Sequence, residues 1–449
     1  MMIKGHNPKA HGTQIVLWLL LSLLLIGTSD LWGQGILLNP PIPENLGVNI
    51  HFTNPRPGEM KELAAAGFRW VRMDFNWAQI EHEKGRYDFS AYDQLMAALK
   101  PYHIRPIFIL DYTNKFYDHG LSPYDAAGRQ AFANWVAASV KHFQGQGAVW
   151  EMYNEPNGEF WSPKESAPDY VKLALKVGET MRETAPGETY IGPAGAVVDL
   201  WFLAYCFQSG LLNYWSAVSI HPYRQRIPET VIRPYAAVDW LINKYAPRGK
   251  TVPVIAGEWG YPSTPNWFDM SDEGQAKMLA REFLVNIMEE VPVTIWYDWH
   301  DDGADPKDSN LHYGVVRNPY KAGGDPVYAP KPAYFASQTL SRFFSGYTFN
   351  ARLAVGEAND YVLLFTRGHK ARLAAWTTST TAHEITIPRA KGKFRVTGFE
   401  GANTGDLHAH RSGLKINVSD APQYLDPLNP SGLSHVIASK QNTSTVRPN

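Results

Sequence analysis

The chain has 449 residues, of which 44% are hydrophobic and 19% charged, and its formal net charge is −1. This composition is that of an ordinary globular protein and excludes an intrinsically disordered chain. Because the charges nearly cancel, we expect no bulk electrostatic attraction to nucleic acid and predict no nucleic-acid partner. The length exceeds that of one simple sandwich and fits a barrel of roughly 250–300 residues with a small companion domain.

Residues 1–35 have the layout of a secretory signal peptide or an N-terminal membrane anchor. Lys4 and Lys9 precede an apolar run over residues 15–26, and small and polar residues follow it. The run is short for a membrane-spanning helix, and its charged-then-apolar order is typical of a signal peptide. No clear cleavage site stands out, so an uncleaved membrane anchor through residues 15–26 is the alternative. Either interpretation predicts an exported protein, periplasmic or secreted.

From residue 36 to residue 345 the sequence alternates between short apolar runs and segments with helical periodicity. The expected strands cover residues 47–52, 69–75, 105–111, 150–155, 190–194, 217–223, 252–259 and 293–299. The expected helices cover residues 59–66, 90–100, 128–144, 166–181, 201–209, 229–245, 271–289 and 331–344, with Ser90, Ser166 and Ser271 as N-terminal caps. Eight such units predict an α/β fold, a closed (β/α)8 TIM barrel, in preference to a doubly wound open sheet.

Residues 346–428 are predicted to form a small C-terminal β-sandwich domain. Strand-like runs at 361–365, 372–376, 384–387 and 415–418 are separated by Gly, Asn and Asp turns. No convincing helical pattern interrupts these runs. The polar end of the chain, residues 429–449, is expected to be a disordered tail.

Two glutamates are expected to meet at the mouth of the barrel, because functional groups stand at the carboxyl ends of barrel strands. Glu155 ends the fourth expected strand, and Glu258 ends the seventh. Two carboxylates that flank one opening are what cleavage of a glycosidic bond requires. One must be protonated to donate to the leaving oxygen, and the other must be ionised to attack the sugar or activate water. For Glu155 taken alone, a solvated loop residue is the alternative.

Supporting polar side chains are expected from the same strand ends: Arg72, Asn154, His221 and Tyr223. Arg72 could hold Glu258 ionised through a charge-assisted hydrogen bond, or it could instead neutralise Asp74. Alternatively, His221 could be a core histidine whose ring nitrogens are both hydrogen-bonded within the protein. Three aspartates after the eighth strand raise the alternative of a calcium loop: Asp298, Asp301 and Asp302. Their spacing matches no metal motif, so we predict no metal and no other cofactor.

On the expected strands, these residues resemble the motifs of the clan A retaining glycoside hydrolases. The resemblance rests on Arg72, Asn154-Glu155-Pro156, His221-x-Tyr223, Ala256-Gly257-Glu258-Trp259-Gly260 and Trp296, in that order. Within the clan, the runs 47–49, 67–72, 296–303 and 330–334 look most like family 39, with family 5 as the alternative. The trailing β-sandwich agrees with the architecture of family 39.

The resemblance implies a role for each matching residue. Glu155 would be the general acid/base, and Glu258 would be the nucleophile of a double-displacement reaction with net retention. Asn154 would contact the hydroxyl beside the reacting carbon. Arg72 and Tyr223 would hold Glu258.

The remaining residues are expected to line the mouth and bind the sugar chain. His221 would lie at the same mouth, and Trp296 would form the floor under the sugar ring. Trp299 and Trp161 are expected to line further subsites, with the packed shell of the barrel as the alternative. Aromatic rings stack on the apolar faces of sugars, yet they also fill cores.

The sequence thus predicts an exported, monomeric retaining glycoside hydrolase with a polysaccharide or oligosaccharide substrate. The export layout, the size and the single appended β-domain resemble endo-acting enzymes that cleave bacterial exopolysaccharide in the biofilm matrix. The enzymatic alternatives are an exo-acting β-xylosidase or β-glycosidase and a cellulase- or mannanase-like enzyme. A transglycosylase would use the same residues, and a non-catalytic polysaccharide-binding protein is the alternative of another class.

Overall fold

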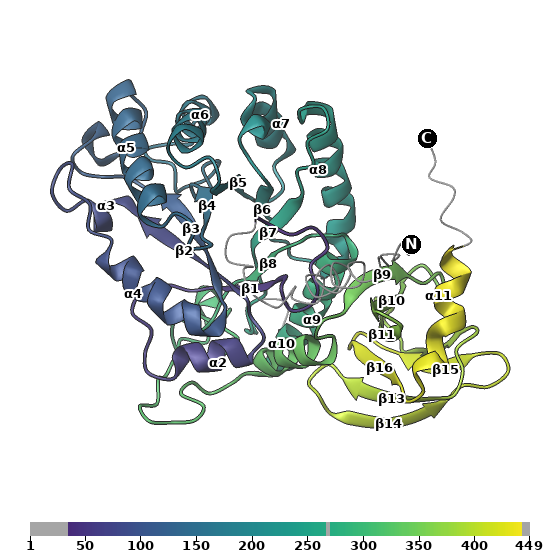
Figure 1. The fold of residues 1–449 in the computed structure, drawn as a ribbon. Helices are drawn as coiled ribbons and strands as arrows, with labels where there is room; N and C mark the ends of the chain where they lie inside the picture. Colours follow the sequence, from purple (N-terminus) through teal and green to yellow (C-terminus); the bar gives the residue numbers. More distant parts are fainter. Residues whose placement is uncertain (1–34, 266–269, 442–449) are drawn as a thin grey trace, which may run out of the picture.

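The computed structural model describes residues 35–265 and 270–441, and its larger part is a closed barrel of eight parallel strands (Figure 1). Each strand pairs with the next along the chain, and β1 pairs with β8 to close the barrel. The strands are β1 (Leu46–Asn49), β2 (Trp70–Asn76), β3 (Arg105–Asp111), β4 (Val149–Met152), β5 (Thr189–Ala196), β6 (Val218–His221), β7 (Val254–Trp259) and β8 (Thr294–Trp296). The predicted TIM barrel is confirmed.

Helices connect the strands and surround the barrel (Figure 1). They are α2 (Glu59–Ala65), α3 (Trp77–Ile80), α4 (Ser90–Leu99), α5 (Ala126–His142), α6 (Ala167–Thr184), α7 (Leu200–Gln208), α8 (Ile232–Tyr245), α9 (Asp272–Met288) and α10 (Pro332–Phe343). Because helices cover the outside and side chains fill the inside, strands β1, β3, β4, β6 and β8 are buried along their whole length.

The predicted helix caps are correct in two of three cases. Ser166 and Ser271 precede α6 and α9, and each hydroxyl oxygen accepts a backbone N–H three residues further on. Ser90 is not a cap. It is the first residue of α4, after Phe89, and its own backbone N–H donates to Asp88 Oδ1 at 2.9 Å.

The C-terminal domain consists of two antiparallel sheets, as predicted for the β-sandwich. A six-stranded sheet has the order β14-β13-β16-β11-β10-β9, and β12 pairs with β15 in a two-stranded sheet. The strands are β9 (Thr348–Arg352), β10 (Asp360–Arg367), β11 (Lys370–Thr377), β12 (His383–Ile387), β13 (Lys393–Gly398), β14 (Asn403–His408), β15 (Leu414–Val418) and β16 (Gln423–Pro427).

The prediction of a disordered tail from residue 429 is wrong for the part of the tail that the structure describes. A 3-10 turn, η7 (Pro430–Leu433), and a short helix, α11 (Ser434–Gln441), follow the last strand. Leu433 and Val436 are buried in the core of the sandwich, and burial of these two side chains holds the segment. Because the segment is mostly polar in sequence, its composition did not indicate that Leu433 and Val436 are buried. Residues 442–449 lie outside the described residues.

The barrel and the sandwich share a buried polar contact. Glu229, in the 3-10 turn η5 (Pro228–Val231) before α8, accepts two hydrogen bonds from Arg281 of α9, at 2.8 and 2.6 Å. It also accepts one from the indole N–H of Trp376 on β11, at 2.7 Å. These three donors compensate the buried carboxylate and fix the sandwich against the barrel beside α9.

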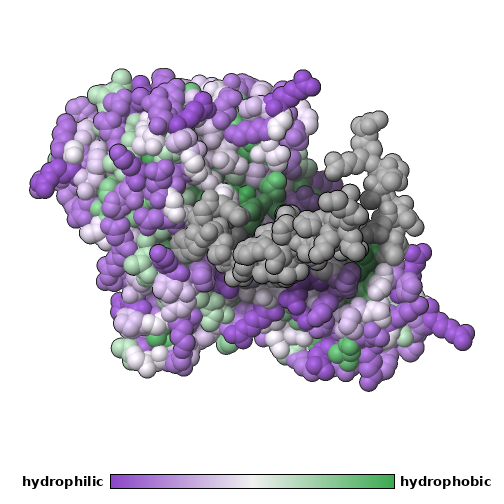
Figure 2. Space-filling view, in the orientation of Figure 1, coloured by the Kyte–Doolittle hydropathy of each residue, from purple (hydrophilic) through white to green (hydrophobic). Residues whose placement is uncertain are grey.

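The face of the molecule shown in Figure 2 is mostly hydrophilic, with apolar residues in small patches. Among the described residues, no helix has the length and apolar character needed to cross a membrane. The expected signal peptide or anchor, including the run at residues 15–26, lies outside the described residues.

Candidate active site

Glu155 lies on a loop after β4 whose backbone is bonded to the neighbouring strand. Its φ is 45°, a left-handed conformation that residues other than glycine rarely adopt. Its backbone N–H donates to Ala194 O on β5 at 2.9 Å, and its carbonyl accepts from Gly158 N–H at 3.0 Å. Such conformations cluster at functional sites, where the surrounding structure must hold them. The loop holds the Glu155 side chain at the mouth of the barrel, where it is 21% exposed.

Glu258 lies near the end of β7, and both of its carboxylate oxygens are held. Tyr223 Oη donates to Oε1 at 2.9 Å, and Arg72 Nη1 donates to Oε2 at 2.7 Å. The preceding residue is a glycine, and a Cβ on Gly257 would lie 2.2 Å from Ser219 Oγ and 3.1 Å from Glu151 Oε1, so a larger residue would displace these buried side chains. The Glu258 side chain is 14% exposed, so a small part of it faces solvent.

Arg72, on β2, is fully buried and connects four strands of the barrel. Besides Glu258 on β7, its Nε donates to Glu151 Oε2 on β4 at 2.5 Å. Its Nη2 donates to Asn154 Oδ1 at 2.9 Å and lies 3.1 Å from His221 Nε2 on β6. One guanidinium therefore positions the nucleophile candidate, the residue before Glu155 and the histidine between them.

Glu151 is a site residue that the sequence did not single out. It is fully buried on β4, and its Oε1 has no hydrogen-bond partner within the described structure. The ion pairs of Arg72 are with Glu151 and Glu258, whereas the sequence offered Glu258 or Asp74. The sequence feature that could have identified Glu151 is an ionisable residue inside a strand, between the apolar residues Trp150 and Met152.

His221 links Arg72 to Glu155. Its Nδ1 lies 2.8 Å from Glu155 Oε1. An arginine can only donate, so His221 Nε2 accepts from Arg72 and the imidazole proton resides on Nδ1. Burial lowers the pKa of His221 to about 4, which makes the ring neutral at higher pH. The Nδ1–H therefore donates to Oε1 of Glu155, and the other carboxylate oxygen is left to carry a proton.

The surroundings of Glu155 and Asn154 set the pKa of the first and the orientation of the second. Burial raises the pKa of Glu155 above its ordinary value, although the charge of Arg72 acts in the opposite direction. Because an arginine can only donate, the atom of Asn154 that faces Arg72 is Oδ1, which accepts. The NH2 group of Asn154 therefore remains to donate elsewhere. A sugar hydroxyl is a suitable acceptor.

The three predicted sugar-binding tryptophans are buried. Trp296 is 0% exposed, Trp299 is 1% exposed and Trp161 is 2% exposed. The indole N–H of Trp296 donates to a backbone carbonyl at 3.1 Å, and that of Trp299 donates to Glu59 Oε1 at 3.1 Å. The structure therefore places all three in the packed shell, the alternative considered for Trp161 and Trp299, and none presents an open ring face to the mouth.

Two tyrosines that the sequence did not single out lie beside Glu258. Tyr297 directly follows β8, and its ring packs edge-on against His51 and Tyr313, with centroid distances of 5.7 and 5.4 Å. Burial raises the pKa of Tyr313 to about 12, and the negative charge of Glu258 adds to this effect. Unlike Trp296, Tyr297 is partly exposed, so its ring is available to a sugar.

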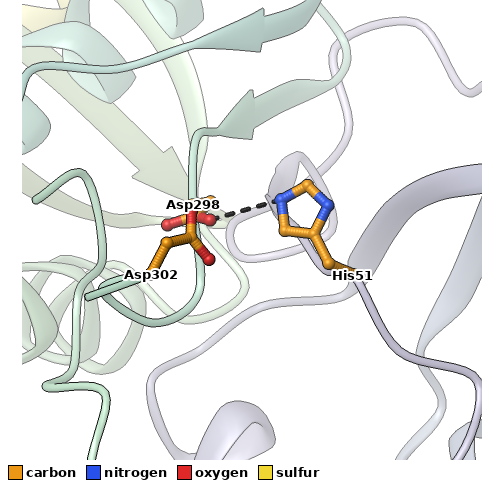
Figure 3. A group of neighbouring side chains, drawn as sticks. All are labelled: His51, Asp298 and Asp302. Carbon is orange, nitrogen blue, oxygen red and sulfur yellow. Dashed lines mark ion pairs between the residues drawn. The ribbon is translucent and has the colours of Figure 1, made fainter. Parts of the chain in front are cut away.

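A second polar cluster joins the loops after β1 and β8 (Figure 3). His51 Nε2 lies 3.3 Å from Asp298 Oδ2, and the carboxylate of Asp302 faces the same space. Burial opposes protonation of His51, but contact with Asp298 and the charges of Asp302 and Asp74 raise its pKa to about 9. Burial raises the pKa of Asp298 to about 6. At neutral pH, His51 and Asp298 therefore form an ion pair.

Two groups of side chains in the described residues bring three possible metal ligands together. One is the cluster of Figure 3, and the other is Glu155, His221 and Glu258, each with ligand atoms within 4.8 Å of one another. The alternative of a calcium loop is not supported, because Asp301 is bonded to Lys331 Nζ at 2.9 Å and is not grouped with the other two aspartates. The first group supplies one imidazole and two carboxylates, short of the six to eight oxygens that calcium takes.

The spacing of the two glutamates indicates which reaction they suit. A carboxylate oxygen of Glu155 lies within 4.8 Å of one of Glu258. Retaining glycosidases place the two carboxyl groups about 5–5.5 Å apart, whereas inverting enzymes need about 6.5–9.5 Å to admit a water molecule between the base and the sugar. The short spacing fits direct attack by one carboxylate on the sugar carbon.

Comparison with known proteins agrees with this geometry. No family model matches the sequence, and no curated protein matches it. Among solved structures, the chain is similar to a family 39 glycoside hydrolase from the gut symbiont Bacteroides cellulosilyticus WH2, with 26% identity, a TM-score of 0.73, and coverage of 86% of this chain and 81% of that chain.

Two further structures share the fold. A family 39 β-xylosidase from Caulobacter crescentus has 16% identity and a TM-score of 0.63, and the match covers 88% of this chain and 98% of that chain. A family 30 endoxylanase from Clostridium papyrosolvens C71 has 12% identity and a TM-score of 0.58, with 86% and 97% covered. Both families belong to clan A, so the resemblance predicted from the motifs is confirmed, and the similarity supports a glycosidase.

Proposed function

We propose that this glycosidase acts by double displacement with retention, with Glu155 as the general acid/base and Glu258 as the nucleophile. The observation that carries the proposal is the carboxylate pair delivered by β4 and β7, with oxygens within 4.8 Å of each other. Both side chains are partly exposed at the same end of the barrel, so a substrate can reach them.

The reaction follows from the environments of the two groups. Glu258 attacks the anomeric carbon and forms a glycosyl ester while the bond to the leaving oxygen breaks. Glu155, whose pKa is raised by burial, gives its proton to that oxygen. As a carboxylate, Glu155 then removes a proton from water, which attacks the same carbon and releases Glu258. Two inversions give net retention.

The surroundings of the mouth favour an uncharged sugar at the reacting position. Asp298 is buried, and neither of its carboxylate oxygens has a hydrogen-bond partner within the described residues, although His51 pairs with it. The cations nearest the glutamates are already engaged, Arg72 by Glu151 and Glu258, and His51 by Asp298. Among the described residues, a uronic acid would therefore meet carboxylates, with Arg72 and His51 already paired.

The finer proposal is an endo-acting, monomeric enzyme without cofactor that cleaves bacterial exopolysaccharide outside the cytoplasm. It is supported by the export layout of residues 1–35, the overall size and the single appended β-sandwich. The family 39 β-xylosidase among the structural neighbours favours the alternative, in which single sugars are released from a chain end.

Product sizing separates these two modes of action. The protein is incubated with a panel of β-linked polysaccharides that includes bacterial matrix polymers, and the products are separated by size. An early drop in chain length with mixed oligosaccharides is expected. Release of monosaccharide alone would contradict endo action, and no cleavage of any polymer or aryl β-glycoside would contradict the hydrolase itself.

A further inference from the structure

The first turn of α7 carries a tryptophan that projects almost entirely into solvent. Trp201 is 89% exposed. Val197 and Leu200 before it and Tyr205 one turn later are also exposed. Single exposed apolar residues are common, but several on one short segment indicate a binding surface. In the barrel, the first turn of a helix lies at the carboxyl ends of the strands, the end that bears Glu155.

This segment is bonded to the loop that holds Glu155. The side chain of Asn157 donates to Ala196 O at 3.1 Å, and its Oδ1 accepts from Ala196 N–H at 2.8 Å. Asn157 Nδ2 also lies 3.4 Å from Asp199 Oδ2. Asp199 in turn caps α7 by accepting from the backbone N–H groups of Trp201 and the next residue. The position of Trp201 is therefore fixed relative to Glu155 through three residues.

A second exposed aromatic residue follows Glu155 on the same loop. Phe160 is 47% exposed, and its ring stacks on that of Tyr112, which follows β3, with a centroid distance of 5.5 Å. Its backbone carbonyl accepts from Tyr153 Oη at 3.3 Å. Phe160 is thus a supported ring with an open face, and no aromatic partner other than Tyr112 is found for it among the described residues.

We propose that Trp201 and Phe160 bind the leaving-group side of a polysaccharide chain. Glu155 must touch the leaving oxygen, so the departing part of the chain extends on the Glu155 side of the mouth, over the loops after β4 and β5. The reacting sugar and the chain before it lie toward β7, β8 and β1, where Glu258 and Tyr297 stand. Flat apolar rings suit the C–H faces of sugars.

This inference rests on the proposed function and deepens it, because it names where a long substrate binds. A substrate whose leaving group is a single aryl ring does not extend to Trp201. Polymeric substrates do. The inference therefore predicts a difference between two substrates on one enzyme, which a general loss of folding or chemistry would not produce.

The test compares Trp201→Ala and Phe160→Ala with Trp240→Ala as the matched control. Trp240 is 61% exposed but lies in the second half of α8, which runs back toward the amino ends of the strands. A panel of p-nitrophenyl β-glycosides first identifies a sugar that the wild-type enzyme accepts. kcat/KM is then measured on that glycoside and on the end-labelled β-linked hexasaccharide of the same sugar.

For Trp201→Ala we expect kcat/KM on the hexasaccharide to fall roughly three- to tenfold, with the p-nitrophenyl glycoside unchanged and the preferred cleavage position shifted. Phe160→Ala should behave likewise, and Trp240→Ala should affect neither substrate. Equal values for Trp201→Ala and wild type on the hexasaccharide would overturn the inference while leaving the hydrolase intact. Absence of activity in the wild type on every glycoside would instead overturn the proposed function.

Discussion

Replacement of Arg72 by methionine is expected to lower the free energy of unfolding by about 3–5 kcal/mol, because it leaves a buried carboxylate without its cation. Glu151 is fully buried, and its bond to Arg72 Nε, at 2.5 Å, is the only partner found for the carboxylate in the described structure. Methionine has a similar length, so the cavity term is small. Loss of Arg72 destabilises the charged Glu258 less than Glu151, because Tyr223 still donates to Glu258 and its side chain is partly exposed.

A double-mutant cycle isolates the pair. Glu151→Gln alone is expected to cost about 1.5–3 kcal/mol, the range for a hydrogen bond to a charged group. In the double variant neither charge is buried alone, so its cost should be smaller than the sum of the two single costs by about 1–3 kcal/mol.

Urea unfolding at pH 7, followed by tryptophan fluorescence, measures all four proteins. Arg86→Met, at an exposed ion pair with Glu83, is the control and should change the midpoint little. Strictly additive costs, or a cost for Arg72→Met similar to that of the control, would refute the claim that Arg72 compensates a buried charge.

Two further predictions concern pH. The protonated form of Glu155 is lost as pH rises through its raised pKa, which gives the kcat/KM profile its alkaline limb. The Glu155→Ala variant should therefore lose that limb, measured on a dinitrophenyl glycoside because its leaving group needs no proton. A retained limb would assign the limb to another group. The pKa of His51 is raised to about 9 by Asp298, and burial raises the pKa of Asp298 to about 6. Their ion pair should therefore stabilise the fold between these two values and progressively less as pH rises through 9. Urea unfolding of wild type and Asp298→Asn at about pH 7.5 and pH 10 tests this: the stability of wild type relative to the variant should be smaller at pH 10, and a constant difference would contradict it.

The barrel and its glutamates were predictable because their signals are local. Each strand is a short apolar run, and a segment with helical periodicity follows it. The number and order of the strand–helix units can therefore be counted along the chain. Once the barrel is assumed, Glu155 and Glu258 fall on strand ends, and topology alone places them at one mouth. The structure brings them together with Arg72, His221 and Tyr223, all of which the motifs identified.

The aromatic residues were not predictable in the same way. Whether a tryptophan after a strand faces the mouth or the shell depends on a rotation of the backbone that composition does not encode. Trp296 and Trp299 lie in the shell, while Tyr297, between them in sequence on the β8 side, is the partly exposed ring. Trp201, at the start of a predicted helix, belonged to no motif, and only its exposure and its connection to Asn157 distinguish it.

The central claim is that Glu258 forms the covalent bond and Glu155 transfers the proton, and the configuration of a glycosyl azide tests it most directly. With azide and an activated aryl β-glycoside, Glu258→Ala should give the α-glycosyl azide, because azide replaces the nucleophile and inverts the centre once. Glu155→Ala should give the β-glycosyl azide, because azide attacks the covalent intermediate. The two products are distinguished by the coupling constant of the anomeric proton. The opposite assignment, or near-native hydrolysis by Glu258→Ala without azide, would contradict the account.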